Sequence, residues 1–332
     1  MQVNRRSLLA GAASAASLAV LIGGLVTLAN CQGQAPRSPA ASHSTRLTSP
    51  FTGEPVPFLR RELIFKIDNV PQARPPTALK HADIVYLLPV DGDLSRIFAV
   101  FSSHIPPVVG PVRSARQEDI ELLRQFGTPA FAFSGAQPAL LPVVEHARIV
   151  NLYAGTHAGY FRSASRIAPY NLFASTRRLL AQAPHASLAR DIGFRFGPAP
   201  PGGKQTTSYR VSFPAASFRF NWSAAEHRWL VWMDGTRSYD ATGGRLGGPT
   251  VVIQYVRVTG SVFRERGVKP PYANTVGSGS AVVLRDGRAY RVHWSRRFRG
   301  SGTSFTLPDG QRMPFARGQV WVVFAYGPGS TA

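Results

Sequence analysis

The chain has 332 residues, of which 44% are hydrophobic and 17% are charged. That balance excludes a disordered, collagen-like or coiled-coil protein. Its 38 basic and 17 acidic residues give a formal net charge of +21, which would attract anionic surfaces or polymers. The sequence has no basic run interleaved with aromatic residues and no zinc knuckle, so we do not expect it to bind nucleic acid.

The basic residues are almost all arginine, because lysine accounts for only four of the 38, at positions 66, 80, 204 and 269. Planar guanidinium groups suit bidentate binding of phosphate and carboxylate. A GC-rich genome would produce the same bias, so composition alone does not separate the two explanations.

Residues 1–31 have the plan of an export signal, with a short basic start and then an uncharged apolar segment. The pair Arg5-Arg6 resembles a twin-arginine signal, with general secretory export as the alternative. Cys31, the only cysteine, closes the apolar segment as in a lipobox, although Asn30 stands where Gly, Ala or Ser is usual. We expect a lipid on Cys31 that holds the protein at the outer face of the cytoplasmic membrane. An uncleaved membrane anchor and cleavage elsewhere are the alternatives.

Residues 32–50 are rich in Ser, Ala, Gln and Pro and predict a flexible tether. Residues 51–201 predict a mixed α/β domain, because strand-like apolar runs occur together with helical spacing. We expect helices at 117–126, 139–146 and 176–182, and strands at 63–67, 84–88, 96–102 and 129–133.

A Pro/Gly-rich linker ends near residue 203, and after it every regular segment predicts a strand. Asp-Gly pairs at 234–235, 286–287 and 309–310 mark hairpin turns. The expected fold class is therefore α+β, with a mixed α/β N-terminal domain followed by a small antiparallel all-β C-terminal domain at residues 205–328.

Two Ser-x-x-Gln sequences, starting at Ser114 and Ser134, predict capping boxes at helix starts. A helix start presents free N–H groups and partial positive charge, and so favours an anion. Arg113 and Arg116 flank the first box, and two arginines there repel each other unless an anion is present. We expect an anion site at this position, with helix capping in the absence of a ligand as the alternative.

Further candidates for the ligand-binding site lie between apolar runs: Asp68, Asn69, Asp91, Arg96, Arg162, Arg166 and Asn171. Carboxylates beside arginines serve as structural ion pairs or as acid/base groups, and spacing does not separate these roles. No G-x-S-x-G elbow, P-loop or H-E-x-x-H motif occurs, and the eight histidines lack metal-ligand spacing. We expect no metal and no cofactor, and a binding protein in preference to an enzyme.

Several motifs resemble those of the YerB-like lipoproteins, in the same order. The most specific is Gly110-Pro-Val-Arg-Ser-Ala-Arg116. Phe65-Lys-Ile-Asp-Asn69 precedes it, and Arg166-Ile-Ala-Pro-Tyr-Asn-Leu172 follows it. In the C-terminal half the resemblance continues through His293-Trp-Ser-Arg296. It implies a bacterial, extracytoplasmic, usually lipid-anchored protein with two domains. It implies no activity, because the family's function is not established.

Three positions depart from the family's pattern. Leu87 stands where Glu is usual, Tyr170 where His is usual, and Phe133 where His is frequent. An acid/base role at these positions is therefore not expected in this chain.

Three functions stay open at this point. The first is an envelope binding or accessory module whose arginine-lined cleft holds an anionic wall polymer. The second is an enzyme acting on envelope glycan or peptide, with Asp68 and Asp91 as acid and base. The third is a protein that docks other envelope proteins through its β domain.

Overall fold

The computed structural model describes residues 47–265 and 267–331. The predicted signal, Cys31 and most of the predicted tether lie outside the described residues. The described residues belong to one compact unit. Within the described part, no helix has the length and apolar character needed to cross a bilayer.

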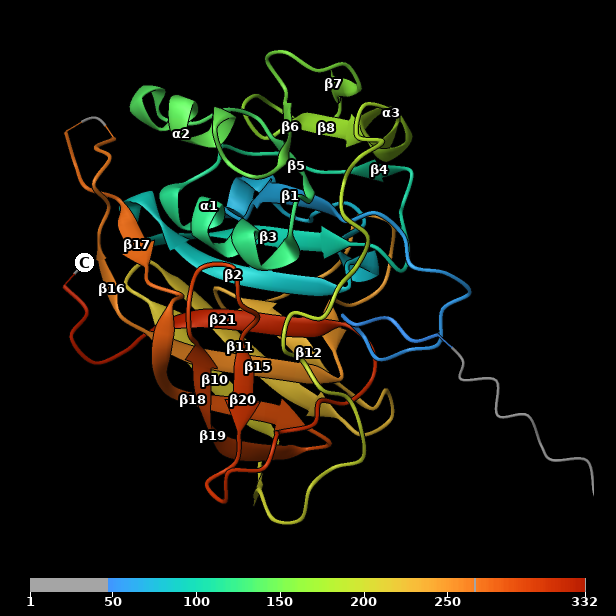
Figure 1. Ribbon diagram of the computed structural model, residues 1–332, viewed down its shortest axis with the longest axis vertical. Coiled ribbons are helices and arrows are strands. Elements are labelled where there is room, and N and C mark those ends of the chain that lie inside the picture. Colours follow the sequence, from blue (N-terminus) through green and yellow to red (C-terminus); the bar gives the residue numbers. More distant parts are fainter. Residues whose placement is uncertain (1–46, 266, 332) are drawn as a thin grey trace, which may run out of the picture. The chain divides into compact units, whose positions relative to one another are not determined.

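One large mixed sheet runs through the molecule in the order β20-β19-β18-β15-β21-β2-β3-β1-β5-β6, and β9 also pairs with β19 (Figure 1). Its strands are β1 (Leu63–Asp68), β2 (Ile84–Val90), β3 (Leu94–Phe101), β5 (Ala130–Phe133), β6 (Val150–Tyr153), β9 (Lys204–Gln205), β15 (Thr250–Val256), β18 (Gly277–Arg285), β19 (Arg288–Arg296), β20 (Ser304–Thr306) and β21 (Val320–Tyr326).

The N-terminal and C-terminal halves of the chain share this sheet. Strand β21 runs parallel to β15 on one side and parallel to β2 on the other, so it joins the two halves edge to edge. The linker near residue 203 leads into β9, which pairs with β19. The predicted division of the chain therefore lies between two sets of strands that belong to one sheet.

Smaller elements cover both faces of the sheet. They are the sheet of β10 (Ser208–Phe213), β11 (Ala216–Ser223), β12 (Arg228–Met233), β13 (Thr236–Arg237) and β14 (Gly247–Gly248); the sheet of β4 (Val108–Val109), β7 (Tyr160–Arg162) and β8 (Leu172–Ser175); the pair β16 (Val258–Gly260) and β17 (Pro271–Ala273); and helices α1 (Gln117–Leu123), α2 (Leu141–Glu145) and α3 (Thr176–Ala181).

Strand alternation divides the buried side chains into two cores. In β1, Leu63, Phe65 and Ile67 face the core that also contains the β10–β12 side chains and α3. Ile64 faces the opposite core with the apolar residues of α1. Lys66 and Asp68, which alternate with the first set, are therefore on the α1 side.

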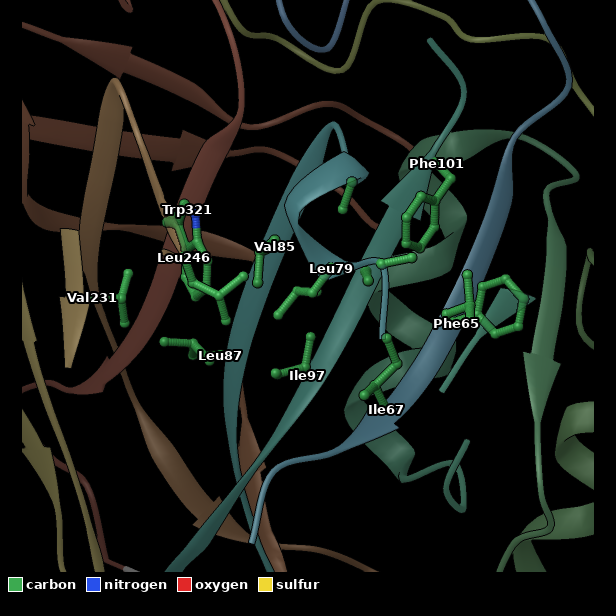
Figure 2. Close-up of a cluster of buried hydrophobic side chains, with 14 of the residues drawn as sticks. Phe65, Ile67, Leu79, Val85, Leu87, Ile97, Phe101, Val231, Leu246 and Trp321 are labelled. Atoms are coloured by element: carbon green, nitrogen blue, oxygen red, sulfur yellow. The ribbon is translucent and has the colours of Figure 1, made fainter. Parts of the chain in front are cut away.

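Figure 2 shows the first core, where side chains of β1, β2 and β3 meet Val231, Leu246 and Trp321 from the C-terminal half. Leu87 lies in this core and is fully buried. An apolar residue suits that position, whereas an ionised carboxylate there would lose its hydration without a partner. Phe133 is also fully buried, and its ring stacks between Phe131 and Tyr153.

The predicted fold class is confirmed, since the chain is mixed α/β with few helices and many strands. Each of the three predicted helices contains a short α-helix, extended by a 3-10 turn at 124–126 and at 138–140. Asp234 and Asp286 adopt positive φ in their hairpin turns, as the Asp-Gly pairs predict. Strand β21 departs from the antiparallel pattern, because both of its neighbours run parallel to it.

The folded body begins earlier than the predicted tether ends. Thr48 forms a bridge with Pro55, and the Ser49 side chain is buried and accepts a hydrogen bond from the backbone N–H of Phe51. Residues 47–50 are thus part of the body and not of the tether.

Candidate functional site

A cavity of about 640 Å³ is lined by the two arginines of the most specific sequence motif and by several other predicted site residues. Its walls come from the turn between β2 and β3, the segment just before α1, and the loop that leads to β17. The lining residues are Asp91, Gly92, Asp93, Arg96, Arg113, Arg116, Glu265, Val268, Lys269, Pro270 and Pro271. Both halves of the chain therefore contribute to one cavity.

Asp68 and Arg96 lie at the base of this region, at the ends of two neighbouring strands. They are partners in the antiparallel register of β1 and β3, so their side chains lie on the same face of the sheet. Both residues are largely buried, with 2% of Asp68 and 9% of Arg96 exposed. The sheet register therefore brings a carboxylate and a guanidinium together that are far apart in the sequence.

Arg113 is the most accessible of the three arginines in this cavity. Its Nε lies 3.0 Å from Asp68 Oδ2, and 28% of its side chain is exposed. The two atoms form an ion pair but are not aligned for a hydrogen bond, and neither has another hydrogen-bond partner within the described part of the chain. The buried Nε therefore faces Asp68, and only the exposed end of the Arg113 side chain is accessible to a ligand at the cavity wall.

Arg116 is instead held by Asp91. Its Nε donates to Asp91 Oδ2 at 2.9 Å and to Oδ1 at 3.2 Å, and its Nη2 also donates to the same carboxylate. Its Nη1 donates to the Ala115 carbonyl at 2.9 Å. Burial opposes ionisation of Asp91, but the bonds and the charge of Arg116 outweigh it and hold the pKa of Asp91 below its usual range.

Arg96 is short of partners. Its Nη2 lies 3.7 Å from Asp91 Oδ2, and its Nη1 donates a long hydrogen bond of 3.3 Å to the Ser114 carbonyl. Burial, and after it the charge of Arg116, lower the pKa of Arg96 to about 10. An anion near Arg96 would offset that penalty, because it would favour the charged guanidinium.

Among the described residues, the three guanidiniums of this wall form ion pairs within 4 Å with two carboxylates, Asp68 and Asp91. Across the wider site, Lys269 adds a cation, and Asp93 and Glu265 add two carboxylates. The site as a whole is therefore close to neutral, with its positive excess confined to the wall of arginines. A ligand would be recognised there by hydrogen-bond geometry more than by bulk charge.

A buried ionic layer supports this wall from behind. Lys66 is fully buried, and its Nζ lies 2.6 Å from Asp119 Oδ1 and 3.7 Å from Glu118 Oε1. Burial raises the pKa of Glu118 to about 7. None of these three residues is among those predicted to bind a ligand. Lys66 could have been noticed as one charged residue inside an otherwise apolar strand.

The two predicted capping boxes are wrong. Helix α1 starts at Gln117 with Arg116 as its N-cap, and the Arg116 N–H donates to Asp119 Oδ2 at 2.7 Å. Gln117 instead accepts hydrogen bonds from the Ser261 hydroxyl and the Val262 N–H. Acidic side chains thus already occupy the start of a short helix, and it offers no anion site of its own. The expected repulsion between Arg113 and Arg116 is offset, because Arg113 pairs with Asp68 and Arg116 pairs with Asp91.

The second box fails in the same way. Gln137, not Ser134, caps the 3-10 turn at 138–140, and its Oε1 accepts from the Leu140 N–H at 2.9 Å. The Ser134 N–H donates to the Arg113 carbonyl, and the Ala115 N–H donates to the Gly135 carbonyl. Ser134 therefore helps to position the arginine segment through its backbone.

The remaining predicted residues do not line the cavity. Arg162 donates to Asn171 Oδ1 at 2.7 Å on an exposed surface. Arg166 donates to the backbone carbonyls of Ala73 and Pro75. Asn69 donates from its side chain to the Ser95 hydroxyl. Of the residues predicted to bind a ligand, Arg96, Arg113, Arg116 and Asp91 are brought together at the cavity, with Asp68 just behind them.

No group of three or more metal-ligating side chains occurs among residues 47–265 and 267–331. The arrangement is one of guanidiniums and carboxylates. Such a set binds phosphate or carboxylate groups, or it moves protons if a carboxylate is placed at a substrate.

Comparison with protein-family models gives two matches in the chain's own order. Residues 51–189 match "Protein of unknown function (DUF3048) N-terminal domain", and residues 209–322 match the corresponding C-terminal domain. The chain belongs to the DUF3048 family. This DUF3048 protein is also 24% identical over 293 residues to "Putative lipoprotein YerB" of Bacillus subtilis (strain 168), covering 83% of this chain and 86% of that protein.

A solved structure of the YerB protein from Bacillus subtilis has the same fold as this DUF3048 protein. The match has a TM-score of 0.73 at 22% sequence identity, and it covers 84% of this chain and 97% of the solved chain. The resemblance to YerB-like lipoproteins seen in the sequence is thereby confirmed.

Proposed function

We propose that this DUF3048 protein is an extracytoplasmic lipoprotein and that its arginine-lined cavity binds an anionic group of a cell-envelope polymer. Cys31 would carry the lipid and hold the body at the outer face of the cytoplasmic membrane. The name of the Bacillus relative supports a lipoprotein. The apolar segment ending at Cys31 supports the position of the anchor.

The proposal for the cavity rests on the exposure and the hydrogen bonding of Arg113. Its buried Nε lies 3.0 Å from Asp68 Oδ2, and the exposed part of its side chain, 28%, lies at the cavity wall. The buried Arg96 beside it has a pKa lowered to about 10. A phosphate or carboxylate placed between them would satisfy one guanidinium and favour the charge of the other.

An enzyme using Asp68 and Asp91 as acid and base is the alternative. Arg116 holds the pKa of Asp91 below its usual range, so Asp91 is ionised at neutral pH and is not suited to donate a proton. Leu87 and Phe133 supply no titratable group to the site. These observations favour binding over catalysis.

The test compares Arg113→Lys with Arg210→Lys, an exposed arginine on β10. Lysine at 113 keeps the charge beside Asp68 but loses the planar fork. With the full chain in detergent, isothermal titration against inorganic phosphate and a glycerol phosphate polymer should show about tenfold or more weaker binding for Arg113→Lys, since a charge-assisted hydrogen bond contributes roughly 1.5–3 kcal/mol.

The Arg210→Lys protein should bind as the unaltered chain does. Polyglutamate in place of the phosphate polymer tells whether carboxylate serves equally well. Equal affinities of the two lysine variants, or no binding of any of the three anions, would refute the proposal.

A further inference from the structure

A second depression lies on the outside of the N-terminal half, away from the arginine-lined cavity. It is a groove of about 560 Å³. Its floor and rim are mostly apolar, and its charged side chains are all arginine. The lining residues are Phe58, Leu59, Arg60, Arg61, Ile105, Pro107, Thr176, Arg177, Leu180 and Leu188.

Two large apolar side chains stand out from the rim of this groove. Phe58 is 55% exposed and Leu188 is 53% exposed. The Arg60 guanidinium lies over the Phe58 ring, 4.8 Å from its centre. Aromatic and aliphatic tips combined with arginine are typical of surfaces that sit at the boundary between lipid headgroups and acyl chains.

The three arginines of the groove differ in whether their side chains are held by hydrogen bonds. The Nη1 of Arg61 donates to the carbonyls of Leu180 and Ala183, so this side chain supports the groove wall. Arg60 and Arg177 are exposed, and no carboxylate lines the groove. The groove therefore presents uncompensated positive charge beside apolar surface, unlike the near-neutral cavity described above.

The groove also lies beside the point where the described chain begins. The Val56 N–H donates to the Leu47 carbonyl, and Phe58 follows two residues later. Leu47 is itself 44% exposed. This start of the chain and the elements α3 and β4 lie on the same side of the molecule (Figure 1). Fifteen residues, 32–46, separate Leu47 from Cys31, a span of at most about 58 Å.

We propose that this groove is a second membrane contact, which binds an anionic phospholipid surface through Phe58, Leu188 and the free arginines. The proposal goes beyond the polymer-binding function and uses the lipid anchor only to orient the body. Phe58 and Leu188 enter the acyl boundary, and Arg60 and Arg177 bind lipid phosphates. The body then lies on the bilayer with this groove facing it.

The test places a tryptophan in the groove. All five native tryptophans lie between residues 222 and 321, so Phe58→Trp adds a reporter far from them in sequence. Phe298→Trp, at a residue that is 63% exposed in the C-terminal half, is the matched control. Each full-length variant is reconstituted into phosphatidylcholine vesicles with or without phosphatidylglycerol, using lipids brominated in the acyl chains.

The added tryptophan of Phe58→Trp should be quenched in vesicles that contain phosphatidylglycerol, and that of Phe298→Trp should not. Adding Arg60→Gln and Arg177→Gln should weaken the contact about fivefold for each arginine removed, as should high salt. Emission of the native tryptophans reports whether each variant is folded. Quenching with the neutral lipid alone would not support a role for the arginines and would overturn the proposal as stated.

Equal quenching at the two positions, or none at 58, would also overturn it, and would leave a protein partner as the occupant of the groove. Failure of the anchor is seen separately, because Cys31→Ala then changes neither the processing of the chain nor its membrane fraction in cells, also when Arg60→Gln and Arg177→Gln are present. Failure of the polymer-binding function is likewise separate, since it is measured with Arg113→Lys.

Discussion

The pair of Arg116 and Asp91 gives the sharpest prediction about the cavity. Replacing Arg116 by Gln removes three donated bonds from the Asp91 carboxylate, which then has only Arg96, at 3.7 Å, as a nearby cation. The change also removes the bond from Arg116 to the Ala115 carbonyl. If Arg116 holds the site together, this variant must lose stability even without a ligand.

The size of the loss follows from the exposure of the two side chains. Removing one member of a fully buried pair costs about 3–5 kcal/mol, whereas exposed pairs contribute about 0–1 kcal/mol. Arg116 is 9% exposed and Asp91 27% exposed, so water reaches the carboxylate after the change. We expect a loss of about 2 kcal/mol, between those limits. For a chain of this size that lowers Tm by about 3 °C.

The assay is thermal unfolding of the full chain in detergent, with Arg210→Gln as the control for loss of one exposed positive charge. The low pKa of Asp91 gives the pH dependence: its ion pair stabilises the fold above the ordinary carboxyl pKa of 3.8 and loses this effect as pH falls through the lower folded value. The Tm difference between Arg116→Gln and the control should therefore be present at pH 7 and shrink below about pH 4. Equal Tm values for the two variants at pH 7 would show that Arg116 is not a structural partner.

Three further predictions concern other parts of the chain. Cys31→Ala should move the protein out of the membrane fraction or leave it unprocessed; unchanged processing and retention would exclude lipidation. Glu62 is fully buried and burial raises its pKa to about 9, so between its ordinary value of 4.5 and about 9 only the folded state keeps the proton and stability falls as pH rises. In urea unfolding, the free energy of unfolding of Glu62→Gln, compared with that of the unaltered chain, should therefore rise by about 1.4 kcal/mol for each pH unit across that range. A difference that does not change with pH would contradict this. Trypsin should cut first near Lys204, and because β21 pairs with β2 the two pieces should elute together in gel filtration; separate folded pieces would show that the shared sheet does not hold them.

Much of the fold could be predicted from local pattern. The apolar runs at 63–67 and 84–88 become β1 and β2, and the Asp-Gly pairs at 234–235 and 286–287 become turns because both residues adopt positive φ there. The order of strands could not be predicted in this way. Pairing of β21 with β2 joins residues more than 200 positions apart in the chain, and such pairing leaves no local signal.

For the site, too, local sequence pattern identifies some of the residues but not the contacts between distant parts of the chain. Arginines 113 and 116 were found from the sequence, but their function was inferred from a capping box that the structure does not form. The helix starts two residues later. Asp119 accepts a hydrogen bond from the Arg116 N–H, and the Gln117 side chain is bonded to Ser261 and Val262. Ser-x-x-Gln and Arg-x-x-Asp overlap in this segment, and the carboxylate is the stronger acceptor.

Strand alternation would have found the supporting residues. Lys66 and Asp68 alternate with the apolar residues of β1 that face the first core, and Arg96 lies opposite Asp68 in β3. Placing charge on a strand buried on both faces is costly unless each charge has a partner. A lysine, an aspartate and an arginine on one face of neighbouring buried strands therefore require acidic and basic partners above them. Helix α1 and the segment before it supply Glu118, Asp119 and Arg113, and the turn between β2 and β3 supplies Asp91. The cavity is thus a consequence of how the chain neutralises that face. Arg113, the most exposed of its three guanidiniums, is where a ligand would complete the neutralisation.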